Sequence, residues 1–458
     1  MVRSPDTIAA LATPAGASAL AVIRITGPDT ERLARGLSGS PPPPREARRG
    51  RYVDRDGVLV DEVVFTFFPE PRSATGEHVL EISCHGNPFI AQRILEDLFA
   101  LGCRPAEPGE FTKRAFLNGK MDLSQAEAVM DLISARSERA LSAALRQLNG
   151  SLGRHLGPLI EQLISALATV EAHIDFPEED LPAEDRQSLL RTIGAVRDGA
   201  RQLLATRRYG DLLRDGIRTV IAGGTNAGKS SLLNRILGRE RAIVSPEPGT
   251  TRDFIEERAA VGPHGLRLID TAGLNPAPGA VERLAIEKTL ECIEESDMII
   301  FVLDATRPAP PPDPRIAGRL TAERTILALN KVDLLPGEGD SGKAEAAARL
   351  FPGLAAVPVS ALTGAGIEEL KSEMVRRADS FQPSAAEDAV AINARHAHAL
   401  ATADDCLGQS LAKLAANAPA ELLASDLRGA LDAFGEISGK IDNERVLDRL
   451  FSAFCIGK

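Results

Sequence analysis

Long apolar runs and cysteines are scarce in this chain. No run of about 18 apolar residues occurs, and the amino terminus lacks the pattern of a secretory signal. The 458 residues include only five cysteines, an odd number with no close pair. We therefore predict a cytoplasmic protein with reduced thiols that neither spans a membrane nor is exported.

A positive net charge is also absent. The formal charge is −11 and the pI is about 5.3, which argues against a broad phosphate-binding surface but not against a local one. The densest basic run, at 45–51, follows four prolines at 41–44. We interpret this run as a solvated loop, and a nucleic-acid patch is the alternative. The apolar content of 44% supplies cores for about two to four domains.

A phosphate-binding loop is the first chemical feature that the chain does contain. An apolar strand at 219–222 leads into Gly223-Gly224-Thr225-Asn226-Ala227-Gly228-Lys229-Ser230, which matches G-x-x-x-x-G-K-[ST], and a helical stretch follows at 231–237. Glycines in such a loop let backbone N–H groups converge on phosphate oxygens at the positive end of the helix. Lys229 then supplies a point charge, and the Ser230 hydroxyl is predicted to ligate Mg²⁺.

Guanine is predicted as the base from Asn330-Lys331-Val332-Asp333, which follows the apolar strand 325–329. The carboxyl end of a strand is where an open α/β sheet binds ligands. The Asp333 carboxylate can accept hydrogen bonds from N1–H and the 2-amino group of guanine, a pair of donors that adenine lacks. Ser360-Ala361, after the strand 357–359, offers a backbone N–H to guanine O6.

Two further segments complete the predicted GTP site. Asp270-Thr271-Ala272-Gly273 ends another apolar strand, with Asp270 near the metal and the Gly273 N–H near the terminal phosphate. Gly249-Thr250-Thr251-Arg252-Asp253 offers Thr251 as a second Mg²⁺ ligand. The residues predicted to contact GTP are therefore Asn226, Ala227, Gly228, Lys229, Ser230, Ser231, Gly249, Thr250, Thr251, Asp270, Thr271, Ala272, Gly273, Asn330, Lys331, Asp333, Ser360 and Ala361.

The groups that drive hydrolysis are less evident than those that bind GTP. Leu274 stands where many small GTPases carry a glutamine that orients the attacking water. Asn226 either directs an oxygen to a monovalent cation beside the phosphates or bonds its own backbone. Arg252 is a competing source of charge or a structural ion-pair partner. Glu282 is a candidate for orienting the attacking water; alternatively, it is an ordinary residue on a helix surface.

The remaining sequence predicts three kinds of domain. Residues 1–118 alternate β-rich runs with one helical stretch near 90–101, which indicates an α+β domain. Helical periodicity occupies about 122–208 and resumes near 400, on either side of the GTP-binding segment. We expect one discontinuous all-α domain into which an α/β P-loop domain of the Ras-like type is inserted. The expected boundaries are 1–118, 119–215, 216–378 and 379–458.

Several other segments form a pattern typical of one family. They are Asp6-Thr7-Ile8-Ala9, the stretch from Pro108 to Lys120, Asp122 to Ala128, Asp175-Phe176-Pro177-Glu178-Glu179 and Phe454-Cys455-Ile456-Gly457-Lys458. With these and the GTP motifs, the chain resembles the MnmE (TrmE) family of tRNA-modification GTPases from end to end. The resemblance implies a folate-binding amino-terminal domain that also dimerises, a helical domain and an inserted G domain.

The resemblance also implies an activity and its partners. The family's G domains meet across the homodimer in the GTP state, and potassium activates hydrolysis. Together with the FAD-binding protein MnmG (GidA), with which it forms a heterotetramer, the family adds an aminomethyl or carboxymethylaminomethyl group at C5 of the wobble uridine of certain tRNAs. The alternative function is a switch-type GTPase that assists ribosome assembly, but no basic RNA-binding module is evident in the sequence.

Individual residues inherit roles from the same resemblance. Glu282 corresponds to the catalytic acid, and Mg²⁺ would be held by Ser230 and Thr251. The implied potassium ligands are Asn226, Ser245, Glu247 and Thr250. Ser245 is also an implied GTP contact. The implied contacts of 5-formyltetrahydrofolate, or a related one-carbon folate, are Arg24, Glu81, Lys120 and Lys458; surface ion pairs are the alternative. Cys455 corresponds to a tail cysteine that is associated with modification activity; the alternative is that it is a buried packing residue.

Two departures from the family pattern carry expectations of their own. Side chains in the stretch from Ala15 to Leu20 replace glycines of the usual pattern, and their Cβ atoms leave less room for a ligand or a second subunit to approach the backbone; the sequence leaves open whether this weakens folate binding. Asn87 stands where a glycine is usual, and a positive φ is expected there.

Overall fold

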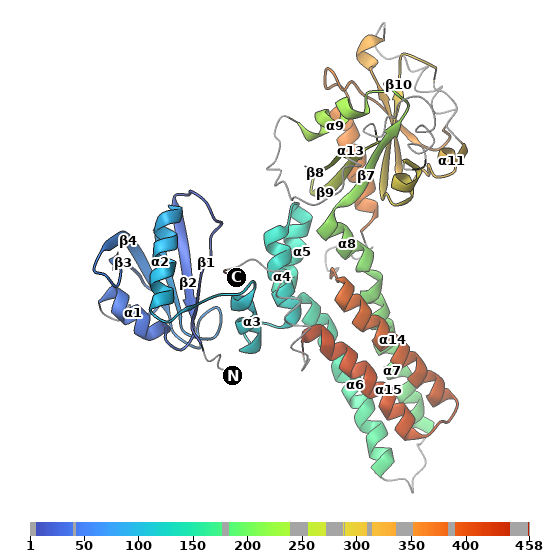
Figure 1. Cartoon of the computed structure of the whole chain (residues 1–458). Helices are drawn as coiled ribbons and strands as arrows, with labels where there is room; N and C mark the ends of the chain where they lie inside the picture. The colour runs from blue at the N-terminus through green and yellow to red at the C-terminus, as the bar shows by residue number, and fades with distance from the viewer. Residues whose placement is uncertain are drawn as a thin grey trace. The chain divides into compact units, whose positions relative to one another are not determined.

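The structure is a computed structural model (Figure 1), and it describes residues 6–39, 43–175, 183–238, 255–271, 287, 289–308, 314–335, 351–382, 390–439 and 457. The chain divides into two compact units. The first comprises Met1–Met130, Leu148–Leu190 and Gln409–Lys458, and the second comprises Asp131–Gln147 and Arg191–Gly408. Within the described ranges, no helix has the length and apolar character needed to cross a bilayer.

A six-stranded sheet in the order β3-β4-β5-β2-β1-β6 forms the amino-terminal part of the first unit. Ala21, Ile23 and Ile25 alternate along one strand and pack with residues of α1 and α2 in a single apolar core. The predicted α+β class is confirmed. The elements are β1 Ile8–Leu11, β2 Leu20–Thr26, α1 Thr30–Ser38, β3 Ala47–Val53, β4 Leu59–Phe68, β5 Val79–His85, α2 Pro88–Ala100 and β6 Arg104–Pro105.

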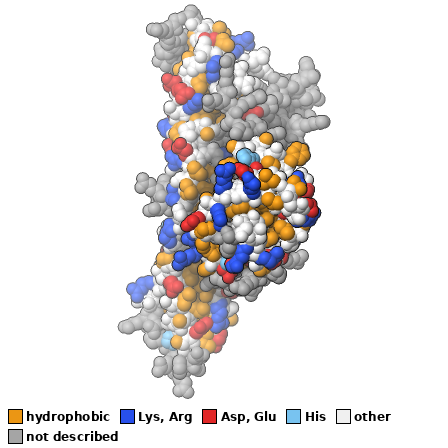
Figure 2. Space-filling model, turned by 90° about the vertical axis from the view of Figure 1, so that its left-hand side faces the viewer, with side chains coloured by type: hydrophobic (Ala, Val, Ile, Leu, Met, Phe, Trp, Pro, Cys, Tyr) orange, Lys and Arg blue, Asp and Glu red, His pale blue; other side chains and the backbone are white. Residues whose placement is uncertain are grey.

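The basic run at 45–51 lies mostly in β3, so the prediction of a loop there was wrong. This strand forms one edge of the sheet and pairs antiparallel with β4, with its arginines exposed. Tyr52 anchors it, because its buried side chain donates a hydrogen bond of 2.9 Å to Asp97. Charged side chains suit an edge strand because they oppose pairing of its free side with another chain. On the face shown in Figure 2, Lys and Arg side chains lie in small groups among acidic and apolar ones.

Helices make up the rest of the first unit and continue into the second. Helices α6 and α15 run side by side (Figure 1). In the sequence, α6 precedes the GTP-binding segment and α15 follows it. Leu163 and Val170 of α6 and Phe434 of α15 are fully buried, so the helical periodicity predicted on either side of the GTP-binding segment corresponds to buried apolar faces. The helices are α3 Glu110–Leu117, α4 Leu123–Ser134, α5 Glu138–Leu148, α6 Ser151–Asp175, α7 Ala183–Ala205, α8 Arg207–Asp215, α14 Ala394–Ala415 and α15 Ala420–Ser438.

The second unit contains a six-stranded sheet in the order β12-β11-β10-β7-β9-β8, parallel except for the antiparallel pair β8 and β9. Its central strands are buried on both faces, as parallel strands flanked by helices usually are. The inserted α/β fold is thereby confirmed. Its elements are β7 Ile217–Gly223, α9 Lys229–Leu237, β8 Ile255–Val261, β9 His264–Asp270, β10 Met298–Asp304, α11 Pro314–Ala317, β11 Thr325–Asn330, the 3₁₀ turn Val332–Leu334, β12 Ala355–Pro358 and α13 Ile367–Ser380.

Four cysteines lie in the described part of the chain, and all four are free thiols, as predicted. Burial raises the pKa of Cys84 to about 11 and that of Cys103 to about 12. Neither thiol forms the reactive thiolate at neutral pH, so both act as packing residues.

Candidate nucleotide-binding site

The phosphate-binding loop spans the gap between β7 and α9. Gly228 adopts a left-handed conformation with φ 92° and precedes the first helical residue, Lys229. The buried Lys229 ammonium donates to the carbonyls of Gly223 at 3.1 Å and Gly224 at 2.9 Å. Burial lowers the pKa of Lys229, while the nearby Asp270 carboxylate opposes that shift. The loop therefore holds a cation at the end of a helix, where an anionic ligand is stabilised.

The candidate Mg²⁺ position lies between the carboxyl end of β9 and the start of α9. The Ser230 hydroxyl donates a hydrogen bond of 2.6 Å to the Asp270 carboxylate, so the structure brings these two predicted residues together. Asp270 is fixed by the register of the sheet, since it pairs with Ile221 of β7, and the Thr271 hydroxyl donates to the Ile221 carbonyl at 2.9 Å. Hydroxyl and carboxylate oxygens are ligands that Mg²⁺ prefers.

Asn330 joins the phosphate-binding loop to the segment predicted to contact the base. Its side chain is 2% exposed, its Nδ2 donates to the Ala227 carbonyl at 2.8 Å, and its Oδ1 accepts from the Ala361 N–H at 3.0 Å. Ser360 in turn donates to the Asp333 carboxylate at 2.5 Å. The structure thus brings Asn330, Asp333, Ser360 and Ala361 together beyond the carboxyl ends of β11 and β12.

Two residues that sequence reasoning missed support this arrangement. Arg235 of α9 donates to the carbonyls of Ala361, at 2.9 Å, and Leu362. Asp304, at the end of β10, accepts a hydrogen bond of 2.8 Å from the Lys331 ammonium. Nothing in the local sequence points to Arg235, but Asp304 follows a buried apolar strand just as Asp270 does. Its position at the end of a buried strand could have indicated a role at the carboxyl ends of the strands, where ligands bind.

Asn226 is exposed and has a left-handed backbone with φ 60°, which asparagine tolerates better than most residues. Ser231 is exposed in the first turn of α9. The other predicted GTP, metal and catalytic residues of this part of the chain lie outside the described residues: Ser245, Glu247, Gly249, Thr250, Thr251, Arg252, Ala272, Gly273, Leu274 and Glu282.

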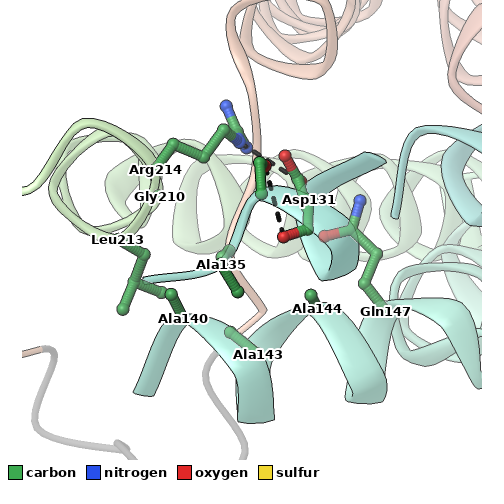
Figure 3. A pocket seen from close by; sticks show the side chains of 11 residues that line it. Asp131, Ala135, Ala140, Ala143, Ala144, Gln147, Gly210, Leu213 and Arg214 are labelled. Carbon is green, nitrogen blue, oxygen red and sulfur yellow. Dashed lines mark hydrogen bonds and ion pairs between the residues drawn. The ribbon is translucent and has the colours of Figure 1, made fainter. Parts of the chain in front are cut away.

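A cavity beside α8, in the second unit, does not offer a further ligand site. Figure 3 shows that small side chains of α5 line it, next to an ion pair of 3.3 Å between Arg214 and Asp131. Its volume is about 30 Å³, which accommodates one water molecule and excludes a substrate.

The candidate folate residues lie on the amino-terminal sheet. Arg24 and Glu81 are register partners on β2 and β5, and the guanidinium donates to one carboxylate oxygen at 2.8 and 2.9 Å. The Gly457 carbonyl accepts from Arg24 at 3.4 Å, which places Gly457 beside this pair. Lys120 donates instead to the Pro71 carbonyl at 3.1 Å. Cys455 and Lys458 lie outside the described residues.

Comparison with known proteins places the chain in a family. Residues 123–455 match the family described as the MnmE helical domain, and residues 7–120 match the GTP-binding protein TrmE N-terminus. The chain is 56% identical over 453 residues to the tRNA modification GTPase MnmE of Opitutus terrae, which covers 99% of each chain. The chain belongs to the MnmE family.

Other relatives extend the similarity within the MnmE family. The tRNA modification GTPase MnmE of Akkermansia muciniphila is 43% identical, with 100% of both chains covered. That of Aquifex aeolicus is 41% identical, with 99% of this chain and 100% of the relative covered. Together with the phosphate-binding loop and the Asn330 contacts, this membership establishes the protein as a GTPase.

Asn87 departs from the MnmE pattern without the strain that we expected. Its φ is −96°, not positive, and its side chain caps α2 by accepting a hydrogen bond of 2.9 Å from the Phe89 N–H. Asparagine is among the best residues for this capping role, and Pro88 follows it at the first helical position. The expectation of a positive φ was wrong because the residue starts a helix.

Proposed function

We propose that the protein is the GTP-hydrolysing component of the system that modifies C5 of the wobble uridine in tRNA, with an aminomethyl or carboxymethylaminomethyl group as the product. The observation that carries this proposal is full-length similarity, at 56% identity, to a protein named as a tRNA modification GTPase. We further propose that it acts as a homodimer with an FAD-binding partner of the MnmG kind. The nucleotide site described above supports the GTP-dependent part of this activity.

In the proposed site, residues at different strand ends bind different parts of GTP: the phosphates, the metal and the base. Lys229 would neutralise charge on the phosphates, and Ser230 and Asp270 would hold Mg²⁺ directly or through water, which their 2.6 Å hydrogen bond supports. Asp333 accepts from N1–H and the 2-amino group of guanine. The hydrogen bond from Ser360 supports this role, because it fixes one carboxylate oxygen and leaves the other for the base.

In the proposed site, a potassium ion would supply positive charge beside the phosphates. Leu274 has no group that can orient water, so charge that develops between the β- and γ-phosphates needs another stabiliser. Asn226, next to the phosphate-binding loop's Ala227, is proposed to hold potassium with Ser245, Glu247 and Thr250. Its exposed side chain and left-handed backbone support this assignment. Thr251 would complete the Mg²⁺ site, and Glu282 would orient the attacking water.

Arg24 and Glu81 are the proposed centre of a site for a one-carbon folate. Their side chains are 24% and 28% exposed, so a ligand can reach both. A carboxylate can accept from the amino groups of a pterin ring, and a guanidinium can bind the glutamate tail of a folate. The ring of Phe111, 5.8 Å from the Arg24 guanidinium carbon, adds an apolar surface beside the pair. Lys120 and Lys458 are proposed to assist, and the role of Cys455 in modification is proposed with them.

Deleting the gene tests the proposed function directly. Mass analysis of tRNA from the deletion strain should show that wobble uridines lack the C5 group, and the intact gene should restore it. A gene carrying Lys229→Ala should fail to restore it, because the phosphates lose their fixed cation. Unchanged wobble uridine in the deletion strain would refute the proposal.

The cation that activates hydrolysis is tested by comparing potassium and sodium at equal ionic strength. Potassium should raise the turnover number on the order of 100-fold, equivalent to about 3 kcal/mol of transition-state stabilisation. Asn226→Lys places a fixed ammonium near the same position, so its residual hydrolysis should lose the dependence on potassium. Equal rates in the two salts, together with turnover abolished by Arg252→Ala, would identify Arg252 as the activating charge instead.

The folate site is tested by calorimetry with 5-formyltetrahydrofolate. Arg24→Ala should weaken folate binding by about 10-fold, since a charge-assisted hydrogen bond contributes roughly 1.5 kcal/mol, and GTP affinity should not change. Arg49→Ala is the matched control, because Arg49 forms an arginine–glutamate pair with Glu62 on the edge of the same sheet. Equal folate affinity for wild type and Arg24→Ala would remove Arg24 from the site.

A further inference from the structure

The ends of β10 and β11 bring Asp304 beside the segment proposed to read guanine. These neighbouring strands are parallel, and Asp304 is the register partner of Asn330. The N–H of Ala305 donates to the Asn330 carbonyl at 2.8 Å, so the pairing continues past the end of β10. Asp304 therefore lies on the strand next to the one that leads into Asp333, the residue proposed to face the base.

Both carboxylate oxygens of Asp304 are engaged. One accepts from the Lys331 ammonium at 2.8 Å, and the other accepts from the Thr306 N–H at 2.9 Å and the Thr306 hydroxyl at 2.6 Å. Burial alone would raise the pKa of Asp304, but these hydrogen bonds outweigh it and lower the pKa to about 2. The carboxylate is thus charged and held in one orientation at neutral pH.

Lys331 needs such a restraint because its backbone is left-handed, with φ 70°. That conformation is costly for a residue with a Cβ atom and persists when the surroundings hold it. It turns the chain into the short 3₁₀ segment, where the Val332 N–H donates to the Val359 carbonyl at 3.3 Å. The same turn places Asp333 against Ser360.

We infer that Asp304 is a positioning residue for guanine recognition, because it holds the Lys331 ammonium on one side and the turn at Thr306 on the other. The inference rests on the proposed base-reading role of Asp333. Asp304 acts through Lys331 and does not itself touch the nucleotide. Since Lys229 and Ser230 lie in α9 and Asp270 ends β9, away from the Asp304–Lys331 pair, loss of Asp304 affects binding of GTP and leaves the hydrolysis step intact.

Steady-state kinetics of Asp304→Ala test this inference. The KM for GTP should rise about 10-fold, which corresponds to roughly 1.4 kcal/mol, while kcat stays within about twofold. Asp297→Ala is the matched control at the opposite end of β10, where Asp297 accepts from the Arg218 N–H at 3.0 Å. Its KM should stay within about twofold of wild type. An unchanged KM in Asp304→Ala, or an equal loss of kcat, would overturn the inference.

A double-mutant cycle tests whether Asp304 acts through Lys331. In a Lys331→Met background, which keeps the apolar stem and removes the ammonium, Asp304→Ala should add less than about twofold to KM. Full additivity of the two effects would overturn the inference. If Asp304→Ala does not fold, Asp304→Asn replaces it, because its amide oxygen can still accept from Thr306. The KM of Asp304→Asn for GTP should rise. An unchanged KM would again overturn the inference.

Asp333→Asn separates this inference from the function on which it rests. An amide at 333 can donate to the 2-carbonyl of xanthine, so this variant should shift preference from GTP toward xanthosine triphosphate. Unchanged preference would refute base reading by Asp333, and with it the inference. A shifted preference together with an unchanged KM in Asp304→Ala would refute the inference alone.

Discussion

The two hydrogen bonds of the buried Asn330 side chain are the contacts on which the nucleotide site depends. One reaches the phosphate-binding loop at Ala227, and the other reaches the base-binding segment at Ala361. A buried amide that loses its partners costs about 1–3 kcal/mol, so Asn330 holds the two loops together. Gly228 shares this constraint, because a Cβ atom there would lie 2.2 Å from Asn330 Nδ2.

The parallel sheet converts this local contact into a complete site. The carboxyl ends of the parallel strands β7, β9, β11 and β12 lie on the same side of the sheet, and packing of the strands' buried faces keeps those ends in a fixed register. The described residues Lys229, Asp270 and Asn330 therefore lie at the ends of these strands or close after them. The Arg24–Glu81 pair follows the same logic on the antiparallel sheet, since cross-strand register partners stay adjacent without any further support.

Local patterns in the sequence were sufficient for the parts of the fold that local interactions determine. The phosphate-binding loop and the strand that precedes Asn330 were predicted because a buried strand followed by glycines or polar residues has few other interpretations. The strand at Ala47–Val53 was not predicted, because prolines and arginines usually indicate a loop and only its pairing with β4 makes it a strand. Asn87 was misjudged for a similar reason, since helix capping by its side chain decides its backbone.

Arg235 and Asp304 were missed because each acts on a residue far along the chain, and only the sheet topology brings the partners together. The roles of Ser245, Glu247, Thr250, Glu282 and Cys455 remain predictions that rest on the family resemblance. The metal, folate and partner assignments likewise await their experiments.

Hydrogen exchange of the nucleotide-free protein, compared between wild type and Asn330→Ala, tests the central role of this side chain most directly. We predict faster exchange of backbone amides in both the segment 227–230 and the segment 360–364, with unchanged protection in β10. Faster exchange in neither segment, or in one of them alone, would contradict the account that Asn330 holds the phosphate-binding and base-binding loops as a single site.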